Sequence, residues 1–464
     1  MPQVRSRGRW VAALLLPLLL GGCANWKDYF VTYSEQVGEL RTQLRAGHAD
    51  EARKAVREST PGDNNYLLDR LEEGRIALLA GDMNGSRRAF DAADKAISAD
   101  DLAARYRVSS ALQQGGSLLT NDQTIAYQPA DFERTLLHHY LALDYLFAND
   151  RQGALVELRR ANQEQEAAAE RRAHDVADAE QAALSQQLSQ QAPSMDRLIG
   201  SAKSGFWNPY TFFFSALLYE ADGNLNDAWV DLQRAYQLAP DQPSVQDALL
   251  RLARLRGSAD ELADIEKKVG RKAPPADPTS GQLVVLYEEG LIPLRRELWL
   301  PLPISTSAGD FRTFTVALPY YDNWSEPSLP LTISAGGVHG QASELGNIEA
   351  LAAYDLKERL PGMVTRQLLR LFAKEQVRQV ASQQANDIGN LVVGIFNTLS
   401  EHADTRSWST LPARASVWST SLPAGSQSVE LNGRRERVVI NPGRTTLVWV
   451  NRVAPDLQIR TISL

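Results

Sequence analysis

The densest group of side chains that could do chemistry lies at residues 401–408, which read Glu-His-Ala-Asp-Thr-Arg-Ser-Trp. An acid, a base and a hydroxyl are the residue types that acid–base and nucleophilic catalysis need. Consecutive residues, however, rarely converge on one substrate, and junctions between helices and strands collect polar residues as caps. Two interpretations therefore stand: a polar junction, or the working cluster of a hydrolase or carbohydrate-binding module.

Other motifs for catalysis or metal binding are missing from the sequence. It contains no phosphate loop ending in Gly-Lys-Ser/Thr, no Gly-x-Ser-x-Gly elbow and no helical His pair with an adjacent Glu. His138 and His139 are neighbours, so on a helix they point about 100° apart and cannot chelate one metal together. Residues 336–340, Gly-Gly-Val-His-Gly, read as a plain loop. We therefore expect no metal, no cofactor and no enzymatic activity.

The single cysteine of the chain, Cys23, follows the pattern of a secretory signal over residues 1–22. Three arginines precede an apolar run at residues 11–20 that is too short to span a bilayer. The sequence Leu-Gly-Gly-Cys at residues 20–23 resembles the bacterial lipoprotein processing box. This resemblance implies cleavage before Cys23, a diacylglycerol on its sulfur and an acyl chain on its new amino group. An ordinary signal peptide with a chance cysteine is the alternative.

Lipidation at Cys23 would fix the location of the protein. Three acyl chains exceed the two signals that stable membrane anchoring needs. Ala24 stands where Asp is the usual inner-membrane retention signal, so the resemblance implies the periplasmic face of the outer membrane. Without residues 1–22 the chain has 46 basic and 56 acidic residues, a formal charge of −10. That charge argues against nucleic acid as a main partner.

Residues 208–241 have the pattern of one complete helical hairpin. Two stripes at helical spacing flank a Gly-Asn break: Phe212, Ala216 and Tyr219 before it, and Ala228, Leu232 and Ala235 after it. Small residues at such positions let two helices cross closely. The hairpin resembles a tetratricopeptide repeat.

The same template recurs along the first half of the chain. Its packing position falls at Ala52, Ser86, Ala154, Ala228 and Leu262, with separations of 34, 68, 74 and 34 residues. Three of the four separations are multiples of the tetratricopeptide period. The copy expected near Thr120 is degenerate, and an insertion at residues 163–192 should project into solvent or extend the preceding helix. We predict a helical repeat domain over residues 23–269.

A Pro-rich and Gly-containing linker at residues 270–281 marks a change in the character of the chain. Residues 282–287 are apolar on both faces, as in a buried strand, and residues 313–318 alternate, as in a half-exposed one. An Asn-Gly pair at residues 432–433 predicts a hairpin, with further strands at 446–451 and 457–464.

A helical stretch at residues 347–399, interrupted at Pro361-Gly362, is embedded among these strands. The β-rich domain therefore covers residues 282–464 and should form an antiparallel, sandwich-like arrangement of seven or more strands. The predicted fold class is α+β multidomain, with a helical tetratricopeptide-like domain followed by this β-rich domain.

Two surfaces are candidates for binding. Stacked hairpins place the free stripe of each first helix along a concave groove, and a groove so apolar should not stand empty. Either a partner peptide fills it, or the insertion or C-terminal domain of this protein does. The candidate groove residues are Leu71, Arg75, His139, Leu143, Tyr210, Phe213 and Leu217.

The second surface is a run of basic residues spaced four apart, and therefore along one helix face: Arg366, Arg370, Lys374 and Arg378. Glu375 is the one acidic residue between 362 and 385, so this segment carries about +3 in an acidic chain. It is either a solvated face that can pair with the acidic repeat domain, or a site for an anionic partner such as a lipid headgroup, a cell-wall polymer or an acidic protein.

The order of these parts is similar to a family of proteobacterial lipoproteins with repeat-like helices and a β-rich C-terminal region. The resemblance is carried by residues 208–241 and by LLHHYLALDYL, GALVELRRANQEQ, VLYEEGLIPLRRELWLPLP, LKERLPGMVTRQLLR and HADTRSWSTLPA. It implies a location in the envelope and carries no activity with it. We expect a lipid-anchored scaffold or regulator of cell-envelope assembly with a protein partner in the periplasm.

Overall fold

The computed structural model describes residues 32–107, 125–174, 190, 192–305, 311–322, 325–382 and 402–464. Several predicted features lie outside these residues: the signal and Cys23, the degenerate copy near Thr120, most of the insertion beyond residue 174, residues 383–399 of the helical stretch, and Glu401.

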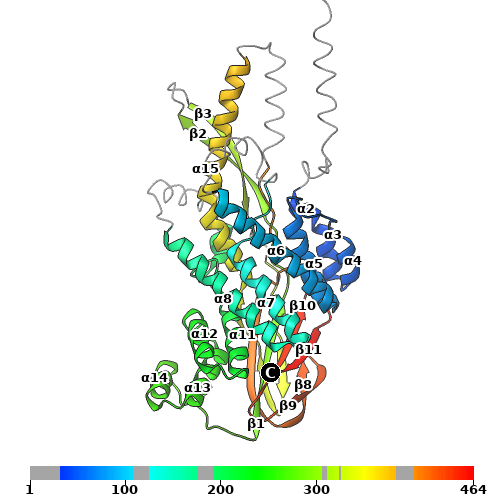
Figure 1. Cartoon of the computed structure of the whole chain (residues 1–464), viewed down its shortest axis with the longest axis vertical. Helices are drawn as coiled ribbons and strands as arrows, with labels where there is room; N and C mark the ends of the chain where they lie inside the picture. The colour runs from blue at the N-terminus through cyan, green and yellow to red at the C-terminus, as the bar shows by residue number, and fades with distance from the viewer. Residues whose placement is uncertain are drawn as a thin grey trace, which may run out of the picture.

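Five helical hairpins make up the repeat domain in the described part of the chain. They are α3 (Gly38–Arg45) with α4 (Ala49–Lys54), α5 (Tyr66–Ala80) with α6 (Met83–Arg107), α7 (Asp131–Phe147) with α8 (Arg151–His174), α11 (Pro209–Ala221) with α12 (Leu225–Leu238), and α13 (Pro243–Arg256) with α14 (Ala259–Val269). Two short helices, α2 (Tyr33–Gln36) and α10 (Pro193–Ile199), flank them. Figure 1 shows the hairpins following one another from α2 to α14.

The small residues that predicted the repeats lie where the helices of each hairpin cross. Ala52, Ser86, Ala154 and Ala228 are completely buried, one in the second helix of each of the first four hairpins. Leu262 is partly buried in the fifth. In the fourth hairpin, the Asn208 side chain accepts a hydrogen bond from the Tyr210 amide and so caps α11. The prediction of tetratricopeptide-like hairpins at these positions is confirmed.

Close crossing in the second hairpin depends on Gly74 of α5. A Cβ atom at this position would lie 2.5 Å from the ring of Phe90, which is completely buried on α6. Gly74→Ala should therefore lower the free energy of unfolding by about 1–3 kcal/mol, although Ala favours a helix over Gly. Urea denaturation measures this. Gly38→Ala in α3 is the control, since its Cβ would meet no atom within 4 Å; an equal loss in both variants would contradict the packing argument.

The C-terminal half contains three sheets. Their strands are β1 (Ser280–Glu289), β2 (Arg296–Ser305), β3 (Phe311–Tyr320), β4 (Thr332–Ala335), β5 (Val338–Gln341), β6 (Ser343–Asn347), β7 (Arg414–Pro423), β8 (Gly425–Leu431), β9 (Arg434–Ile440), β10 (Thr445–Arg452) and β11 (Gln458–Ser463). The orders are β11-β10-β1-β7-β6, β5-β4-β8-β9 and the pair β2-β3. The predicted β8–β9 hairpin is confirmed, with positive φ at Asn432 and Gly433. The expectation of a purely antiparallel domain is wrong, because β1 pairs with β10 in parallel.

Strand β1 is buried on both faces, as its continuous apolar sequence predicts. Leu283 and Val285 belong to a core shared with the four-stranded sheet, which gives the sandwich-like part of the fold. Val284 and Leu286 point the other way and join the core of the helical hairpins. The two predicted domains therefore share one continuous hydrophobic core.

Helix α15 (Ile348–Ser382) runs without a break through Pro361, so the predicted interruption there is wrong. A proline removes one helical hydrogen bond, and packing can offset that loss. Leu360 and Val364, on either side of Pro361, are both buried. The Gln367 side chain also bonds the main-chain N–H and C=O of Ala317 in β3, which holds α15 against the β2–β3 pair. In Figure 1, α15 and this pair extend together from one end of the molecule.

The first part of the predicted insertion extends α8, which continues to His174. It does not project freely. Arg172 forms ion pairs with Asp355 and Glu358 of α15, at 3.1 and 2.9 Å. The long helix of the third hairpin therefore braces α15.

Candidate functional site

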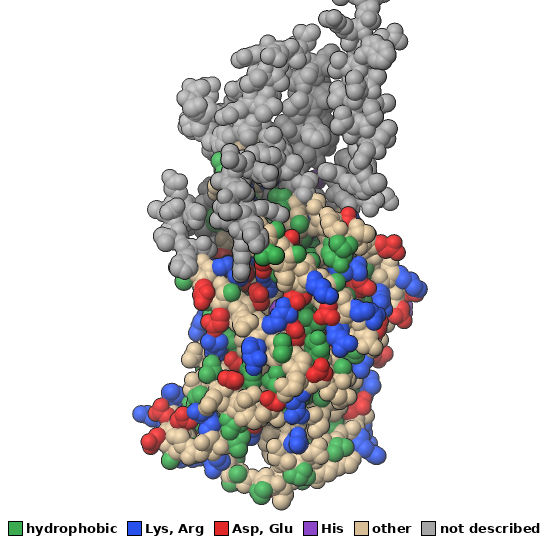
Figure 2. Space-filling model, viewed as in Figure 1, with side chains coloured by type: hydrophobic (Ala, Val, Ile, Leu, Met, Phe, Trp, Pro, Cys, Tyr) green, Lys and Arg blue, Asp and Glu red, His purple; other side chains and the backbone are tan. Residues whose placement is uncertain are grey.

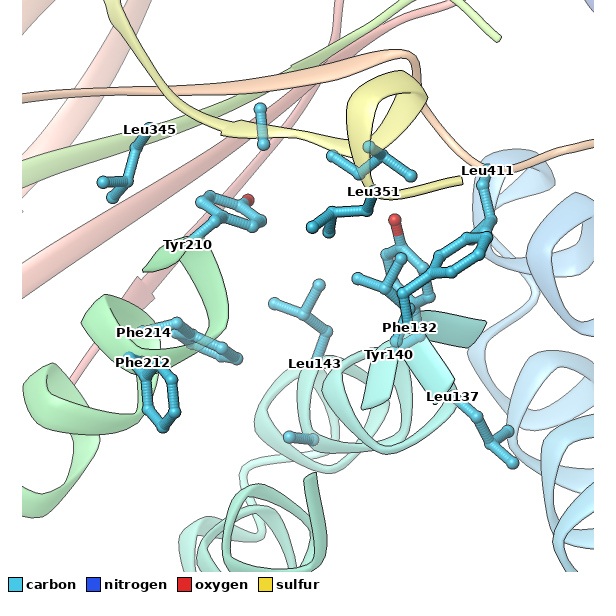
Figure 3. Close-up of a cluster of buried hydrophobic side chains, with 14 of the residues drawn as sticks. Phe132, Leu137, Tyr140, Leu143, Tyr210, Phe212, Phe214, Leu345, Leu351 and Leu411 are labelled. Atoms are coloured by element: carbon cyan, nitrogen blue, oxygen red, sulfur yellow. The ribbon is translucent and has the colours of Figure 1, made fainter. Parts of the chain in front are cut away.

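The groove of the helical array is filled by the C-terminal half of the same chain. All seven predicted groove residues are buried, at 3% exposure or less. Figure 3 shows Leu143 of α7 and Tyr210 of α11 facing Leu345 of β6 and Leu351 of α15. Of the two occupants that the sequence left open, the structure contains the intramolecular one.

A buried ion pair joins the groove to β1. Arg75 Nη2 of α5 lies 2.6 Å from Glu288 Oε2, and both side chains are fully buried. The Tyr210 hydroxyl donates to Glu288 Oε1 at 3.3 Å, and the Arg75 guanidinium lies 4.3 Å from the centre of the Tyr140 ring. Burial alone would lower the pKa of Arg75, but attraction from Tyr140 and Glu288 outweighs it and raises that pKa. Arg75 is therefore charged at any physiological pH.

His139 lies beside this pair without taking part in it. Its Nδ1 is 3.1 Å from the Thr211 hydroxyl, and its ring stacks on that of Tyr210. Burial, helped by the positive charge of Arg75, lowers the pKa of His139 to about 3, so the ring stays neutral. Its neighbour His138 turns elsewhere and contacts Glu157 of α8 at 2.7 Å. The two histidines thus have different partners, as their helical spacing predicts.

The rest of the groove holds residues 402–411, an extended segment that belongs to neither a helix nor a strand. Carboxylates on the groove helices bind its main chain. Glu72 of α5 accepts the Ser409 amide at 2.6 Å and the Thr410 amide at 3.1 Å. Glu133 of α7 accepts the Trp408 amide at 2.8 Å. Charged acceptors strengthen such bonds, and this is how a groove can hold an extended peptide.

Arginine side chains bind the main-chain carbonyl groups of the same segment. Arg41 of α3 donates to the Ser409 carbonyl, and Arg295, after β1, donates to the Arg406 carbonyl at 2.7 Å. Burial lowers the pKa of Arg41 to about 10, so it keeps its charge at neutral pH. Burial likewise raises the pKa of Glu72, although its hydrogen bonds to Thr410 and Ser409 act against that rise. Both the N–H and the C=O groups of the segment are thus bound by charged side chains.

Trp408 anchors the segment by its side chain. The indole is completely buried, with ring centres 5.7 Å from Phe90 and 5.9 Å from Tyr140, both in edge-to-face contact. Its Nε1 donates to the Thr410 hydroxyl at 3.0 Å, which satisfies the indole N–H inside the core. The two ring contacts, with Phe90 and Tyr140, hold the segment against both α6 and α7.

The acid and the base of the segment, Asp404 and His402, make separate contacts. His402 Nδ1 lies 3.2 Å from Glu297 of β2. Asp404 instead pairs with Arg406 at 2.8 Å, and Arg406 also donates to the Ile125 carbonyl. Burial would raise the pKa of Asp404, but Arg406 outweighs it and lowers that pKa. His402 and Asp404 therefore do not converge on one space in the described structure.

The predicted basic residues on α15 do not form one exposed face. Arg366 is exposed, whereas Arg370, one turn later, is 4% exposed. The side chains of Lys374 and Arg378 lie outside the described ones. The two described arginines thus do not share one solvated surface.

Three further residues, Arg41, Glu72 and Glu133, bind the segment in the groove, although the sequence pattern does not predict them. Their one local signal is a charged residue on a helix face that is otherwise buried. Such a signal does not say which main chain the charge will meet, because Ser409 is 337 residues from Glu72 in the chain.

Within the described residues no helix is long and apolar enough to cross a membrane. The same residues contain no group of three His, Cys, Asp or Glu side chains placed to hold a metal ion.

No protein-family model matches the chain, and the comparison with curated proteins finds no match. Among solved structures, the crystal structure of MamA is similar over 52% of this chain and 94% of its own, with 11% identity and a TM-score of 0.29. A putative kinesin light chain of Podosopora anserina, with TPR-like repeats, is similar over 51% of this chain and 92% of its own, with 14% identity and a TM-score of 0.29. At such TM-scores the description of the fold rests on the hairpins and sheets of this chain.

Proposed function

We propose that this protein is a lipid-anchored scaffold or regulator of cell-envelope assembly that binds its partners on the outer face of its repeats. The observation that carries this proposal is the filled groove. The groove residues Glu72, Glu133 and Arg75 each contact the protein's own C-terminal half. The concave face is therefore occupied within the same chain. Repeat arrays bind through the surfaces they expose, and here those are the outer helices.

The second helices of two neighbouring hairpins carry an apolar residue at the same outward position. Val156 follows Ala154 by two residues in α8, and Val230 follows Ala228 by two in α12; their exposures are 49% and 48%. The two helices are joined by an ion pair between Glu166 and Arg234. Figure 2 shows basic and acidic side chains intermixed around the helices, with no field of one sign on that face. A partner would accordingly recognise shape and apolar contact on these helices.

Photo-crosslinking in cells tests this outer face. A crosslinking amino acid at Val156 or at Val230 should capture the same partner. The matched control is Val439 of β9, which is also exposed, at 57%, but belongs to the four-stranded sheet that packs against the other face of β1. Phe213 and Arg370 are unsuitable positions, because both side chains are buried. Failure to capture any partner from both valines, in cells where the protein is normally located, would overturn the proposed scaffold role.

The anchor has its own test. Cells fed with labelled palmitate should incorporate label into the wild-type protein and none into Cys23→Ser, since the thiol and the new amino group both depend on processing at this cysteine. Mass spectrometry of the N-terminal peptide gives the same information independently. An unlabelled wild-type protein, or a labelled variant, would count against lipidation at Cys23.

A further inference from the structure

Two acidic side chains are buried where neighbouring helical hairpins pack against each other. Asp144 of α7 is 1% exposed and contacts α6 of the preceding hairpin. Asp231 of α12 is 4% exposed and contacts α8 of the preceding hairpin. The side-chain hydrogen-bond partners that the structure describes for both carboxylates are neutral hydroxyl and amide groups. Both acids therefore lie inside the repeat array with uncharged partners.

The carboxylate of Asp144 accepts one side-chain hydrogen bond in the described structure. The Ser86 hydroxyl of α6 donates to its Oδ2 at 2.6 Å, and Ser86 is itself completely buried. The second oxygen, Oδ1, is buried and has no hydrogen-bond partner among the described residues. An ionised carboxylate here exchanges its hydration for a single neutral donor, whereas a protonated one has no charge to solvate.

Charged side chains on three helices packed against α7 bear on the ionisation of Asp144. On α6, Arg87 favours the ionised carboxyl and Asp91 opposes it. Arg75 of α5 also favours the ionised form, but its guanidinium is bound to β1 in the buried ion pair. On α8, Glu157 is bound to a histidine of α7. The nearby charges of opposite sign offset one another in part, so burial has the largest effect.

The carboxylate of Asp231 is held by two neutral donors at the next junction. The Ser215 hydroxyl of α11 donates to its Oδ2 at 2.6 Å, and the Asn162 amide of α8 donates to the same oxygen at 2.7 Å. Asn162 also lies 3.2 Å from the Ser215 hydroxyl oxygen. The three side chains thus form one polar cluster between the third and fourth hairpins.

The charged and titratable groups around Asp231 come from its own helix and from both helices that bind it: Arg234 and Asp227 of α12, Glu166 of α8 and Tyr219 of α11. Arg234 favours the ionised carboxyl, but its guanidinium is paired with Glu166 at 2.5 Å. Asp227 opposes ionisation. On α13, Arg251 is paired with Glu220 of α11. The closest partners of Asp231 are therefore the two neutral donors.

Both carboxyls bind a proton more tightly in the folded chain than in the unfolded one. Burial raises the pKa of Asp144 to about 8, although the hydrogen bond from Ser86 acts against the rise. It raises the pKa of Asp231 to about 6, against the hydrogen bonds from Ser215 and Asn162. An aspartate in an unfolded chain has a pKa of about 3.9. Folding therefore takes up protons at both junctions.

We propose that the junctions between the hairpins are proton-binding sites that tighten the repeat array in acid. A proton on Asp144 removes a poorly solvated charge between the second and third hairpins. A proton on Asp231 does the same between the third and fourth, where it joins the helices that expose Val156 and Val230. This inference concerns the stability of the array and rests neither on the scaffold role nor on the lipid anchor.

The direction of the pH dependence follows from the two raised pKa values. Each carboxyl contributes its full stabilisation below about pH 4, where both the folded and the unfolded chain are protonated. That contribution is lost as the pH rises through about 6 for Asp231 and through about 8 for Asp144. These two sites therefore make the repeat array more stable at about pH 5 than at about pH 8.5.

Urea denaturation of the full chain at about pH 5 and about pH 8.5 tests the inference. The gain in the folding equilibrium constant toward acid should be at least about a hundredfold larger in the wild type than in Asp144→Asn/Asp231→Asn. Asparagine keeps a carbonyl oxygen for the serine donors but takes up no proton. Asp241→Asn, which removes an exposed charge, is the matched control and should keep the wild-type gain.

A gain in the double variant within about threefold of the wild-type gain would overturn the inference. A second measurement covers the case in which the double variant does not fold. Infrared spectra of the wild type at about pH 6.5 should show the carbonyl band of protonated carboxyl groups, and this band should disappear above about pH 9. Absence of the band at the lower pH would likewise reject proton binding at these junctions.

Discussion

Replacing Trp408 by Ala should lower the free energy of unfolding by about 3–5 kcal/mol, as is usual when a buried aromatic side chain is removed from a core that cannot collapse around the gap. The indole is fully buried between Phe90 and Tyr140, which belong to different hairpins. The loss should appear in guanidinium denaturation followed by circular dichroism. Limited proteolysis should also cut the chain sooner within residues 402–411, since the segment loses its one aromatic anchor.

Trp299→Ala is the matched control for this experiment. Trp299 is on β2, contacts His402 at the start of the same segment, and is 44% exposed. Its removal should cost less than about 1 kcal/mol, because less surface returns to water and no closed cavity remains. A loss below about 1 kcal/mol for Trp408→Ala would show that the segment is not an integral part of the repeat core.

The helical hairpins could be predicted from the sequence because their rules are local. Ala154 and Ala228 each lie where the two helices of their own hairpin cross. A turn of a few residues separates those two helices in the chain. Small residues at fixed spacing are thus enough to find each hairpin. The same locality explains the success with β8 and β9, where Asn432-Gly433 specifies the turn.

The filling of the groove could be predicted only in part. The apolar stripe of Tyr210 and Leu143 shows that something must cover it, but period and composition do not say which segment. The segment that enters the groove reads as a polar junction, with acid, base and hydroxyl residues in a row. Among them, His402 and Asp404 have separate partners in Glu297 and Arg406. The groove recognises the main chain, which carries no sequence signal.

At Pro361 a local sequence rule gives the wrong prediction. A local rule ends the helix there, yet α15 continues, because Leu360 and Val364 are buried by tertiary packing that a local rule does not include. The parallel pairing of β1 with β10 is hidden for a similar reason. The two strands are separated by more than 150 residues, and an apolar run fits either direction of pairing.

The ion pair between Arg75 and Glu288 should show the second large effect. Arg75→Met should cost about 3–5 kcal/mol, because it leaves a carboxylate buried without its cation. The Tyr210 hydroxyl and Asn451 Nδ2, which lie 3.3 and 3.4 Å from the Glu288 carboxylate, cannot supply a compensating charge. Glu288→Leu should cost a similar amount by stranding the guanidinium. Both are measured by urea denaturation at neutral pH.

The double variant Arg75→Met/Glu288→Leu decides whether the two side chains act as a pair. With both charges gone, neither is stranded, so the double variant should be more stable than either single variant. Some loss should remain, because the Tyr210 hydroxyl loses the acceptor it has in Glu288. If the two single losses simply add, the charges are stabilised separately and the ion pair does not join the repeats to the sheet. If they cancel in large part, the fully buried pair binds α5 to β1 and holds the two halves of the chain in one body.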